Sequence, residues 1–327
     1  MAILVTGAAG FIGYHLSAAL LARGEQVVGV DNINSYYDVA LKQARLARLN
    51  ETSDFAFLQR DITADETFRE ISVDHPAINR VVHLAAQAGV RHSIEHPFDY
   101  IQANLVGHTR VLEYCRHLPA CEHLVYASSS SVYGGNTKLP FSVDDRVDRP
   151  ISLYAATKRA DELMSYAYSH LYDLPQTGLR FFTVYGPWGR PDMAMFKFTK
   201  ALFAGDPISL YNNGDIMRDF TYVDDIVAGI IAVLDSPPSG AEGAPYKVYN
   251  IGNNRSEPLM RVIELLQACT GRTTELVLEP MQPGDVQATY ADIEPIRAAV
   301  GFEPRTSIDQ GIPNFVEWYC QYHGLEK

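Results

Sequence analysis

Tyr154 and Lys158 form a pair whose types and spacing could do chemistry together. They lie four residues apart at the start of a segment with helical periodicity, so both side chains project from one face of the helix, one turn apart. A neighbouring ammonium group favours the phenolate form of a tyrosine, and a phenolate can remove a proton from a hydroxyl group. An ordinary exposed pair of helix residues is the alternative interpretation of this short pattern.

Four consecutive serines, Ser128 to Ser131, end the segment "HLVYASSSS" and precede a Val-Tyr-Gly sequence. A hydroxyl group at the end of a strand can hydrogen-bond an oxygen atom that gains charge during a reaction. The same run is also compatible with a flexible polar loop. It becomes a catalytic candidate only if the fold brings it close to Tyr154.

Three glycines in the segment "GAAGFIG", residues 7–13, follow the first apolar run and open a helical pattern. Glycines in this context let the backbone turn tightly and approach a pyrophosphate at a helix N-terminus. The second run ends in Asp31, where a carboxylate can accept hydrogen bonds from both ribose hydroxyls and would repel a 2′-phosphate. Asp61 and Ile62 follow the third run and suit the edge and face of an adenine ring, although Asp61 alone is also typical of a turn. These features favour NAD over NADP.

The elements that must position these residues alternate in type. Short β-branched runs at residues 3–6, 26–31, 55–61, 80–86, 123–129 and 176–182 are separated by amphipathic segments. This alternation predicts an α/β fold with a doubly wound parallel sheet, in which ligands bind at the carboxyl ends of the strands. Beyond Phe182 the pattern loosens into Pro- and Gly-rich loops with short strands. We therefore expect a first domain over residues 1–182 and a smaller, discontinuous lobe over residues 183–327, with segments that return to the first domain.

The composition narrows the classes of partner. The chain has 327 residues, of which 47% are hydrophobic, and its formal net charge of -12 disfavours nucleic acid and an anionic membrane surface as partners. No apolar run approaches the roughly 18 residues that can span a bilayer. The four cysteines form no CxxC pair, which is typical of a reducing compartment, so we expect a cytoplasmic protein. Neither HExxH nor a clustered Cys/His pattern occurs, and we expect no metal site.

Together, the glycine segment, Asp31, the "HLAA" segment at residues 83–86, the serine run and the Tyr154/Lys158 pair resemble the extended short-chain dehydrogenase/reductase superfamily. The resemblance covers nearly the whole chain. It implies a Rossmann-type sheet with a smaller C-terminal substrate-binding lobe. It also implies that Tyr154 is the acid/base, that Lys158 positions Tyr154 and the nicotinamide ribose, and that Ser129 hydrogen-bonds the reacting oxygen.

The resemblance implies NAD as the cofactor. Its expected contacts are the glycine segment, the ends of the strands, the start of the tyrosine helix and a few flanking positions: Gly7, Gly10, Phe11, Ile12, Gly13, Asp31, Asn32, Asp61, Ile62, Leu84, Ala85, Ala86, Gln87, Asn104, Ser128, Tyr154, Lys158 and Phe182.

Two stretches bear on the reaction and the substrate. Sugar-nucleotide dehydratases of this superfamily carry an acidic residue just before the Tyr-Gly pair, whereas this chain has Ser130 and Ser131, so elimination lacks its acid. Reversible oxidation of one hydroxyl, which is C4 epimerisation, is the simplest remaining chemistry. The stretch "RFFTVYGPWGRPDMA", with Thr183 after the aromatic pair, resembles the UDP-glucuronate 4-epimerases, as do residues 32–46 and 85–93.

In such an enzyme, Arg218 would grip the nucleotide diphosphate, Tyr211 would contact uridine and Arg190 would be the first choice for the C6 carboxylate. The full set of expected substrate contacts is Arg91, Ser129, Ser130, Ser131, Thr183, Arg190, Tyr211 and Arg218. Two alternatives stay open: a 4-epimerase of neutral or N-acetylated UDP-hexoses, and a non-catalytic NAD-binding regulator.

Members of this superfamily commonly dimerise through two long helices. The matching segments here are residues 96–118 and 152–172, and Leu112 and Tyr166 are candidate contacts. The resemblance therefore predicts a homodimer built around a four-helix bundle.

Overall fold

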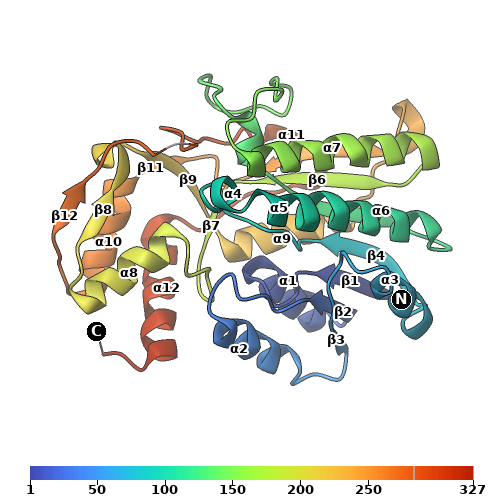
Figure 1. Cartoon of the computed structure of the whole chain (residues 1–327), viewed down its shortest axis with the longest axis horizontal. Coiled ribbons are helices and arrows are strands. Elements are labelled where there is room, and N and C mark those ends of the chain that lie inside the picture. Colours follow the sequence, from blue (N-terminus) through green and yellow to red (C-terminus); the bar gives the residue numbers. More distant parts are fainter. Residues whose placement is uncertain (283, 327) are drawn as a thin grey trace.

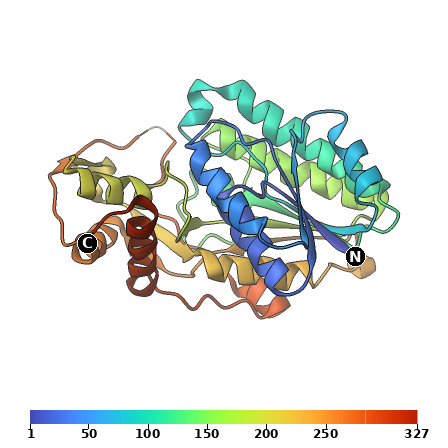
Figure 2. The same cartoon turned by 90° about the horizontal axis from the view of Figure 1, so that it is seen from below.

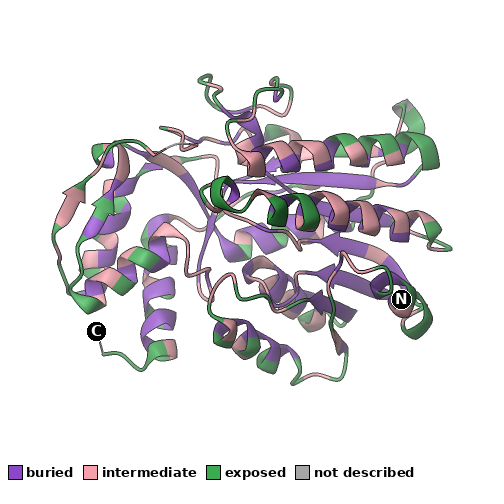
Figure 3. Ribbon diagram, viewed as in Figure 1, coloured by how far each residue is buried: buried purple, intermediate pink, exposed green. Residues whose placement is uncertain are grey.

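The central sheet is buried on both faces. In β1 (Ala2–Thr6), Ala2 and Leu4 belong to one apolar cluster while Ile3 and Val5 belong to another, because successive side chains of a strand point to opposite faces. This explains why the strand sequences are continuously apolar and do not alternate. In the computed structural model, which describes residues 1–282 and 284–326, the strands of this sheet are the main buried elements (Figure 3).

The sheet contains seven parallel strands in the order β10-β6-β5-β4-β1-β2-β3. The other six strands are β2 (Gln26–Asp31), β3 (Phe55–Gln59), β4 (Ile78–His83), β5 (His123–Ser129), β6 (Gln176–Phe181) and β10 (Tyr246–Ile251). The order reverses between β1 and β4, and the crevice at such a reversal is where ligands bind in sheets of this type. The Rossmann-type fold expected from the sequence is confirmed.

Helices cover both faces of the sheet (Figure 1). On one face pack α1 (Phe11–Ala22), α2 (Val39–Leu49), α9 (Val223–Leu234) and α11 (Glu294–Val300). On the other pack α3 (Thr67–Asp74), α6 (Gly107–His117) and α7 (Leu153–Tyr172). The short α4 (His92–Glu95) and α5 (Pro97–Tyr100) lead into α6 through a π-helical segment, Ile101–Val106.

A smaller lobe lies beside the carboxyl ends of the strands, and it holds the C-terminus while the N-terminus lies at the far end of the sheet (Figure 2). Its strands form one group of β7 (Thr183–Tyr185), β9 (Met217–Tyr222) and β11 (Ser256–Pro258) and another of β8 (Ile208–Leu210) and β12 (Leu276–Leu278). Its helices are α8 (Ala194–Ala204), α10 (Leu259–Thr270) and α12 (Ile308–His323). Short 3-10 turns occupy Ser130–Tyr133, Tyr211–Gly214 and Gly240–Glu242.

The lobe has an apolar core of its own, in which Phe196, Leu266, Phe315 and Tyr319 are buried. The chain crosses back from it, because β10 and α9 pack with the central sheet. Among the described residues, no helix is both long enough and apolar enough to cross a membrane.

Candidate active site

A cleft of about 1340 Å³ separates the carboxyl ends of the strands from the smaller lobe. Every site residue expected from the sequence lines it except Asn104. The topology explains this convergence: β1, β2, β4 and β5 are parallel, so their following loops meet at one edge of the sheet.

The turn between β1 and α1 is built from glycines for steric reasons. Gly7 has a φ of +74°, and its N–H donates to the Val30 carbonyl oxygen at 2.7 Å. A Cβ on Gly13 would lie 2.0 Å from the Gly7 carbonyl oxygen, so only glycine lets the helix approach the turn. Gly10 caps α1 without a side chain, and the first helical turn contains no acidic residue. Unblocked N–H groups and the helix dipole therefore face the cleft, an arrangement that fits a pyrophosphate.

Acidic side chains follow β2 and β3 where an adenosine would lie. Asp31 is the last residue of β2, and its carboxylate accepts hydrogen bonds from the backbone N–H groups of Ala9 (3.2 Å) and Ile33 (2.9 Å). Asn32 donates to Asp61 at 2.9 Å. Although burial acts in the opposite direction, hydrogen bonds from Asn32 and Thr63 hold the pKa of Asp61 below its usual value. Together with the glycine turn, this set fits a dinucleotide.

Lys42 and Arg45 on α2 also lie near this region, and nothing in the sequence had singled them out. Lys42 lines the cleft, and its ammonium donates to Asn34 at 2.8 Å; burial lowers its pKa. Arg45 is fully buried and donates to the backbone carbonyl oxygens of Ala9 and Trp188, so it ties the glycine turn to the smaller lobe. An amphipathic helix sequence does not reveal which of its basic residues point inward.

The start of α7 places Tyr154 in the cleft. Ser152 is the N-cap, and its hydroxyl accepts the Ala155 N–H at 3.1 Å, so the helix begins at Leu153 and Tyr154 falls in its first turn. The Tyr154 ring packs edge-on against Tyr100 with 6.0 Å between the ring centroids. One turn on, Lys158 is 2% exposed, and its ammonium donates to the Ala127 carbonyl oxygen and to Asp161, each at 3.0 Å. Lys158 and Tyr154 both line the cleft.

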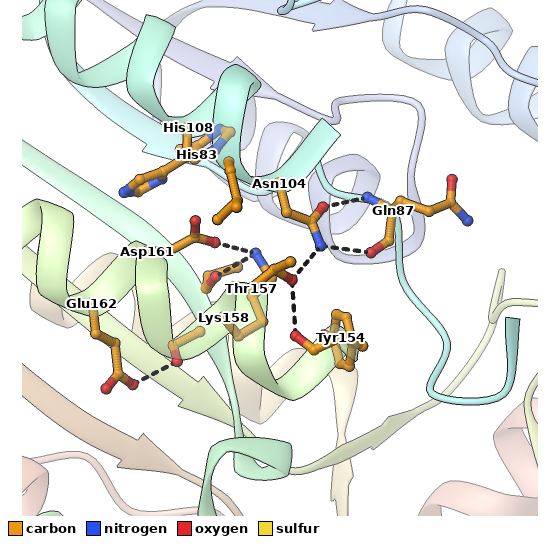
Figure 4. A network of polar contacts seen from close by, with 12 residues as sticks. His83, Gln87, Asn104, His108, Tyr154, Thr157, Lys158, Asp161 and Glu162 are labelled. Carbon is orange, nitrogen blue, oxygen red and sulfur yellow. Dashed lines mark hydrogen bonds and ion pairs between the residues drawn. The ribbon is translucent and has the colours of Figure 1, made fainter. Parts of the chain in front are cut away.

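Asn104 lies behind the cleft wall. Its amide oxygen accepts the Gln87 N–H at 2.8 Å, and its amide group donates to the Gln87 carbonyl oxygen at 3.1 Å and to Thr157 at 3.0 Å (Figure 4). Thr157 in turn donates to the Tyr154 carbonyl oxygen. Asn104 is 1% exposed, so its side chain joins the loop after β4 to α7 and does not reach the cleft directly. Our expectation of a direct cofactor contact therefore becomes one of a positioning role.

The four serines take different orientations. The Ser128 hydroxyl donates to Glu162 at 2.6 Å, while Ser128 also lines the cleft, so its contact with the cofactor stays a prediction. Ser129 caps the 3-10 turn, because its hydroxyl accepts the Ser131 N–H at 3.1 Å, and it also lies 3.1 Å from the Ser131 hydroxyl. Ser130 and Ser131 line the cleft beyond it.

Arg190 already has a carboxylate partner. Its guanidinium donates to Asp192 at 3.0 and 2.5 Å, and Tyr36 donates to the same carboxylate at 3.2 Å. Burial and the Asp192 charge raise the pKa of Tyr36 to about 12, so its hydroxyl stays a donor. Because a guanidinium has five N–H donors, a substrate carboxylate could bind Arg190 without displacing Asp192. Thr183, at the start of β7, lines the same part of the cleft.

Arg91 and Tyr211 lie together on the side of the cleft formed by the smaller lobe. The Arg91 guanidinium is 4.2 Å from the centroid of the Tyr211 ring and 2.8 Å from the Asp285 carboxylate. Arg218, on β9, donates to the carbonyl oxygens of Met217 and Gln287 at 2.9 and 3.2 Å. Arg218 lines the cleft. Because a guanidinium has five N–H donors and both of these contacts use one nitrogen, the remaining N–H groups can bind an anion.

Possible metal ligands do gather at the cleft edge, although the sequence suggested none. The donor atoms of His92, His96 and Asp99 lie within 4.8 Å of one another. His96 and Asp99 are exposed, so water can satisfy both groups. We assign no metal to this group.

Comparison with known proteins decides the family. Residues 3–252 match the model of the NAD dependent epimerase/dehydratase family, which is more than half of the chain. The chain belongs to this family. The resemblance seen in the sequence is thereby confirmed.

Two relatives are similar to this chain over nearly their whole length. Protein CapI of Staphylococcus aureus is 49% identical, with 99% of each chain covered. A probable UDP-glucuronate 4-epimerase of Rhizobium meliloti is 44% identical, with 98% of this chain and 97% of the relative covered. The crystal structure of a UDP-glucuronic acid 4-epimerase from Bacillus cereus, in complex with UDP-glucuronic acid and NAD, is similar with a TM-score of 0.90 and 33% identity, covering 98% of this chain and 100% of that one.

Proposed function

We propose that this protein is an NAD-dependent UDP-glucuronate 4-epimerase, which interconverts UDP-glucuronate and UDP-galacturonate through a 4-keto intermediate. One observation carries the proposal: Tyr154, Lys158 and Ser129 share a cleft in which serines stand where elimination chemistry requires an acid. The relatives named as UDP-glucuronate 4-epimerases support it.

The chain's own residues handle the proton. Tyr154 as phenolate removes the proton of the C4 hydroxyl, and Ser129 hydrogen-bonds the same oxygen as it becomes a carbonyl. Lys158, held from behind by Ala127 and Asp161, favours the phenolate. NAD, when bound, would supply the redox chemistry by taking up hydride from C4. Tyr154 gives its proton back to the oxygen when hydride is returned to C4, and the configuration at C4 is inverted because the 4-keto sugar has by then turned its opposite face to the cofactor.

We assign the cofactor to the glycine turn, Asp31 and the loop after β4. The Gly7 turn and the free N–H groups of α1 face the pyrophosphate, and Asp31 accepts hydrogen bonds from the adenosine ribose. Asp61 and Ile62 flank the adenine.

We assign the substrate to the opposite wall. Arg218 holds the diphosphate and Tyr211 packs beside the uracil, with Arg91 over the tyrosine ring. Arg190, fixed by Asp192, binds the C6 carboxylate together with Thr183 and the hydroxyls of the serine run.

Product analysis by NMR tests the function. The purified protein with bound NAD is incubated with UDP-glucuronate without added reductant, and we expect UDP-galacturonate. Conversion of UDP-glucose or UDP-N-acetylglucosamine alone would favour the neutral-sugar alternative, and a pentose product would indicate decarboxylation. Tyr154→Phe should abolish most turnover while NAD stays bound; a regulator would keep its function in this variant.

Substrate specificity tests Arg190. Arg190→Ala should raise the KM for UDP-glucuronate at least tenfold and change that for UDP-glucose little, because only the former carries a carboxylate. Arg146→Ala removes the same charge at a side chain that is 89% exposed and serves as the control. Equal effects of Arg190→Ala on both substrates would remove it from carboxylate recognition.

We also propose a homodimer and a boundary between the two domains near residue 182. Leu112 does not suit the interface that we expected, because it lies on the inner face of α6 and is fully buried in the apolar core. Leu163 and Tyr166 on the outer side of α7 are 57% and 52% exposed and better candidates. Sedimentation velocity should find a dimer, and Leu163→Asp should yield monomers.

A further inference from the structure

Asp161 is a buried carboxylate that stability does not explain. It is 0% exposed; one of its oxygens accepts a hydrogen bond from Lys158, and the other has no partner in the described structure. A buried polar atom without a hydrogen bond destabilises the folded state, and replacing a buried ion pair by apolar side chains is often neutral or stabilising. A role connected with Lys158 is the simpler reason for a carboxylate here.

The contacts of Lys158 show what that role is. An ammonium group has three N–H donors, of which one is directed to the Ala127 carbonyl oxygen and one to Asp161. Asp161 is fully buried and the Ala127 carbonyl oxygen belongs to β5, which leaves the third donor for the cleft that Lys158 and Tyr154 line. Without Asp161, the ammonium would have only one fixed contact.

The other titratable groups near Asp161 and Lys158 are His83, His108 and Glu162 (Figure 4), and Arg190 and Tyr100 interact electrostatically with Tyr154 in wild type and variants alike. His83 on β4 and His108 on α6 stand with ring centroids 5.3 Å apart, and burial lowers the pKa of His108 to about 3 and that of His83 well below its usual value. The Glu162 carboxylate accepts hydrogen bonds from two arginines, Arg159 and Arg180, which balance its charge. Burial raises the pKa of Asp161 to about 6, against the opposite effect of the Lys158 ammonium, so the carboxylate is charged at neutral pH.

We propose that Asp161 is a positioning residue for catalysis, which fixes the Lys158 ammonium and partly offsets its charge at Tyr154. The inference rests on the proposed function of Tyr154 as the base. It predicts two separable effects. The hydrogen bond sets how well Lys158 is held, whereas the negative charge sets the pH at which the Tyr154 phenolate forms.

Two substitutions separate these effects. Asp161→Asn keeps an acceptor oxygen and removes the charge, so the plateau of kcat should stay within about threefold of wild type while the acidic limb of the pH profile moves down by roughly one pH unit, since Lys158 then acts on Tyr154 without compensation. Asp161→Leu removes the acceptor too, so kcat should fall at least tenfold at every pH. KM for the UDP-sugar should stay unchanged in both.

Asp173→Asn is the matched control. It makes the same chemical change at an exposed residue at the end of the same helix, and its pH profile should overlie that of wild type. All variants are measured with NAD bound, and thermal melts monitor folding. If Asp161→Leu is insoluble, Asp161→Ser, which is smaller and polar, takes its place with the same expected direction.

The outcomes are distinct. Coinciding acidic limbs in Asp161→Asn and wild type would overturn the charge effect, and a normal kcat in Asp161→Leu would overturn the positioning. Loss of thermal stability with an unchanged pH profile would reduce Asp161 to a structural residue. Full activity of Tyr154→Phe would instead overturn the proposed function, whatever the Asp161 variants do.

Discussion

Glu162 offers the sharpest test of how the fold holds the site. Its carboxylate is 1% exposed and accepts four hydrogen bonds: from Ser128 at 2.6 Å, from Arg180 at 2.8 and 2.9 Å, and from Arg159 at 2.7 Å. It thereby joins the carboxyl ends of β5 and β6 to the helix that carries Tyr154. Glu162→Gln removes the charge with little change in volume and turns an amide group toward donors.

The size of the expected loss of stability follows from the guanidinium group that Glu162→Gln leaves without a carboxylate partner. Arg180, with a side chain that is 3% exposed, would lose its only carboxylate among the described residues and keep the Tyr133 hydroxyl at 3.0 Å and the Tyr133 ring at 5.0 Å. Removing one partner of a buried ion pair costs about 3–5 kcal/mol. We therefore expect the free energy of unfolding of Glu162→Gln to fall by about this amount at pH 7, as measured by urea denaturation monitored by circular dichroism.

The loss of stability in Glu162→Gln should depend on pH, because the Glu162 carboxylate titrates. Burial alone would raise the pKa of Glu162, but hydrogen bonds from Arg180 and Ser128 outweigh burial and hold it below 4.5. A group whose pKa is lower in the folded state contributes stability above its unfolded pKa, and this contribution is lost as the pH falls through the folded pKa. The difference between wild type and Glu162→Gln should therefore be full at pH 7 and shrink below pH 4.5.

A double variant tests whether the pair itself is responsible. Glu162→Leu with Arg180→Leu leaves no fully buried charge without a partner, because Arg159, which also loses Glu162, has a side chain that is 32% exposed; the double variant should therefore be less destabilised than Glu162→Gln alone. A Glu162→Gln protein within about 1 kcal/mol of wild type, or additive losses in the double variant, would refute the reasoning.

Three further predictions concern the cleft. Gly13→Ala should weaken NAD binding at least tenfold in calorimetry, because its Cβ would lie 2.0 Å from the Gly7 carbonyl oxygen, while Gly240→Ala, whose Cβ would meet nothing nearer than 3.9 Å, should bind normally. Ser131→Glu should raise the KM for UDP-glucuronate more than that for UDP-glucose, because the added carboxylate repels the C6 carboxylate; equal changes would show that Ser131 lies away from C6. Arg45→Met should lower the melting temperature, because one buried and two partly buried carbonyl and hydroxyl acceptors lose their donor; an unchanged melting temperature would contradict that role.

The central sheet could be predicted from the sequence because its signal is local. Each of the first six strands is a short run rich in β-branched or other apolar residues, and β2 and β5 begin and end at the residues that we expected. The cleft followed from the same information, since parallel strands bring the loops at their carboxyl ends together. The smaller lobe was harder to predict, because strands of three residues such as β8 and β12 are defined by their pairing partners and carry no periodicity.

Side-chain direction was the part that sequence could not supply. Asn104 and Leu112 were placed on the correct elements, yet both point inward, Asn104 to the Gln87 loop and Leu112 to the apolar core. The sequence did not indicate that Asp161 is buried against Lys158, because a carboxylate three residues after a lysine is the ordinary pattern of an exposed helix pair. Only the burial of α7 against β5 and β6 distinguishes that surface pattern from an internal ion pair.

The side-chain orientations of Ser128 to Ser131 determine which of these serines can be replaced without disturbing the fold. Ser128 donates to Glu162, and Ser129 caps the following turn, so substitution of either would disturb the fold along with any effect on the reaction. Ser130 and Ser131 line the cleft further along, and at these positions the type of side chain can change with less cost to the fold. The reaction of this site is therefore most open to change at these two residues, which is why hydroxyls there, in place of carboxylates, argue for epimerisation over elimination.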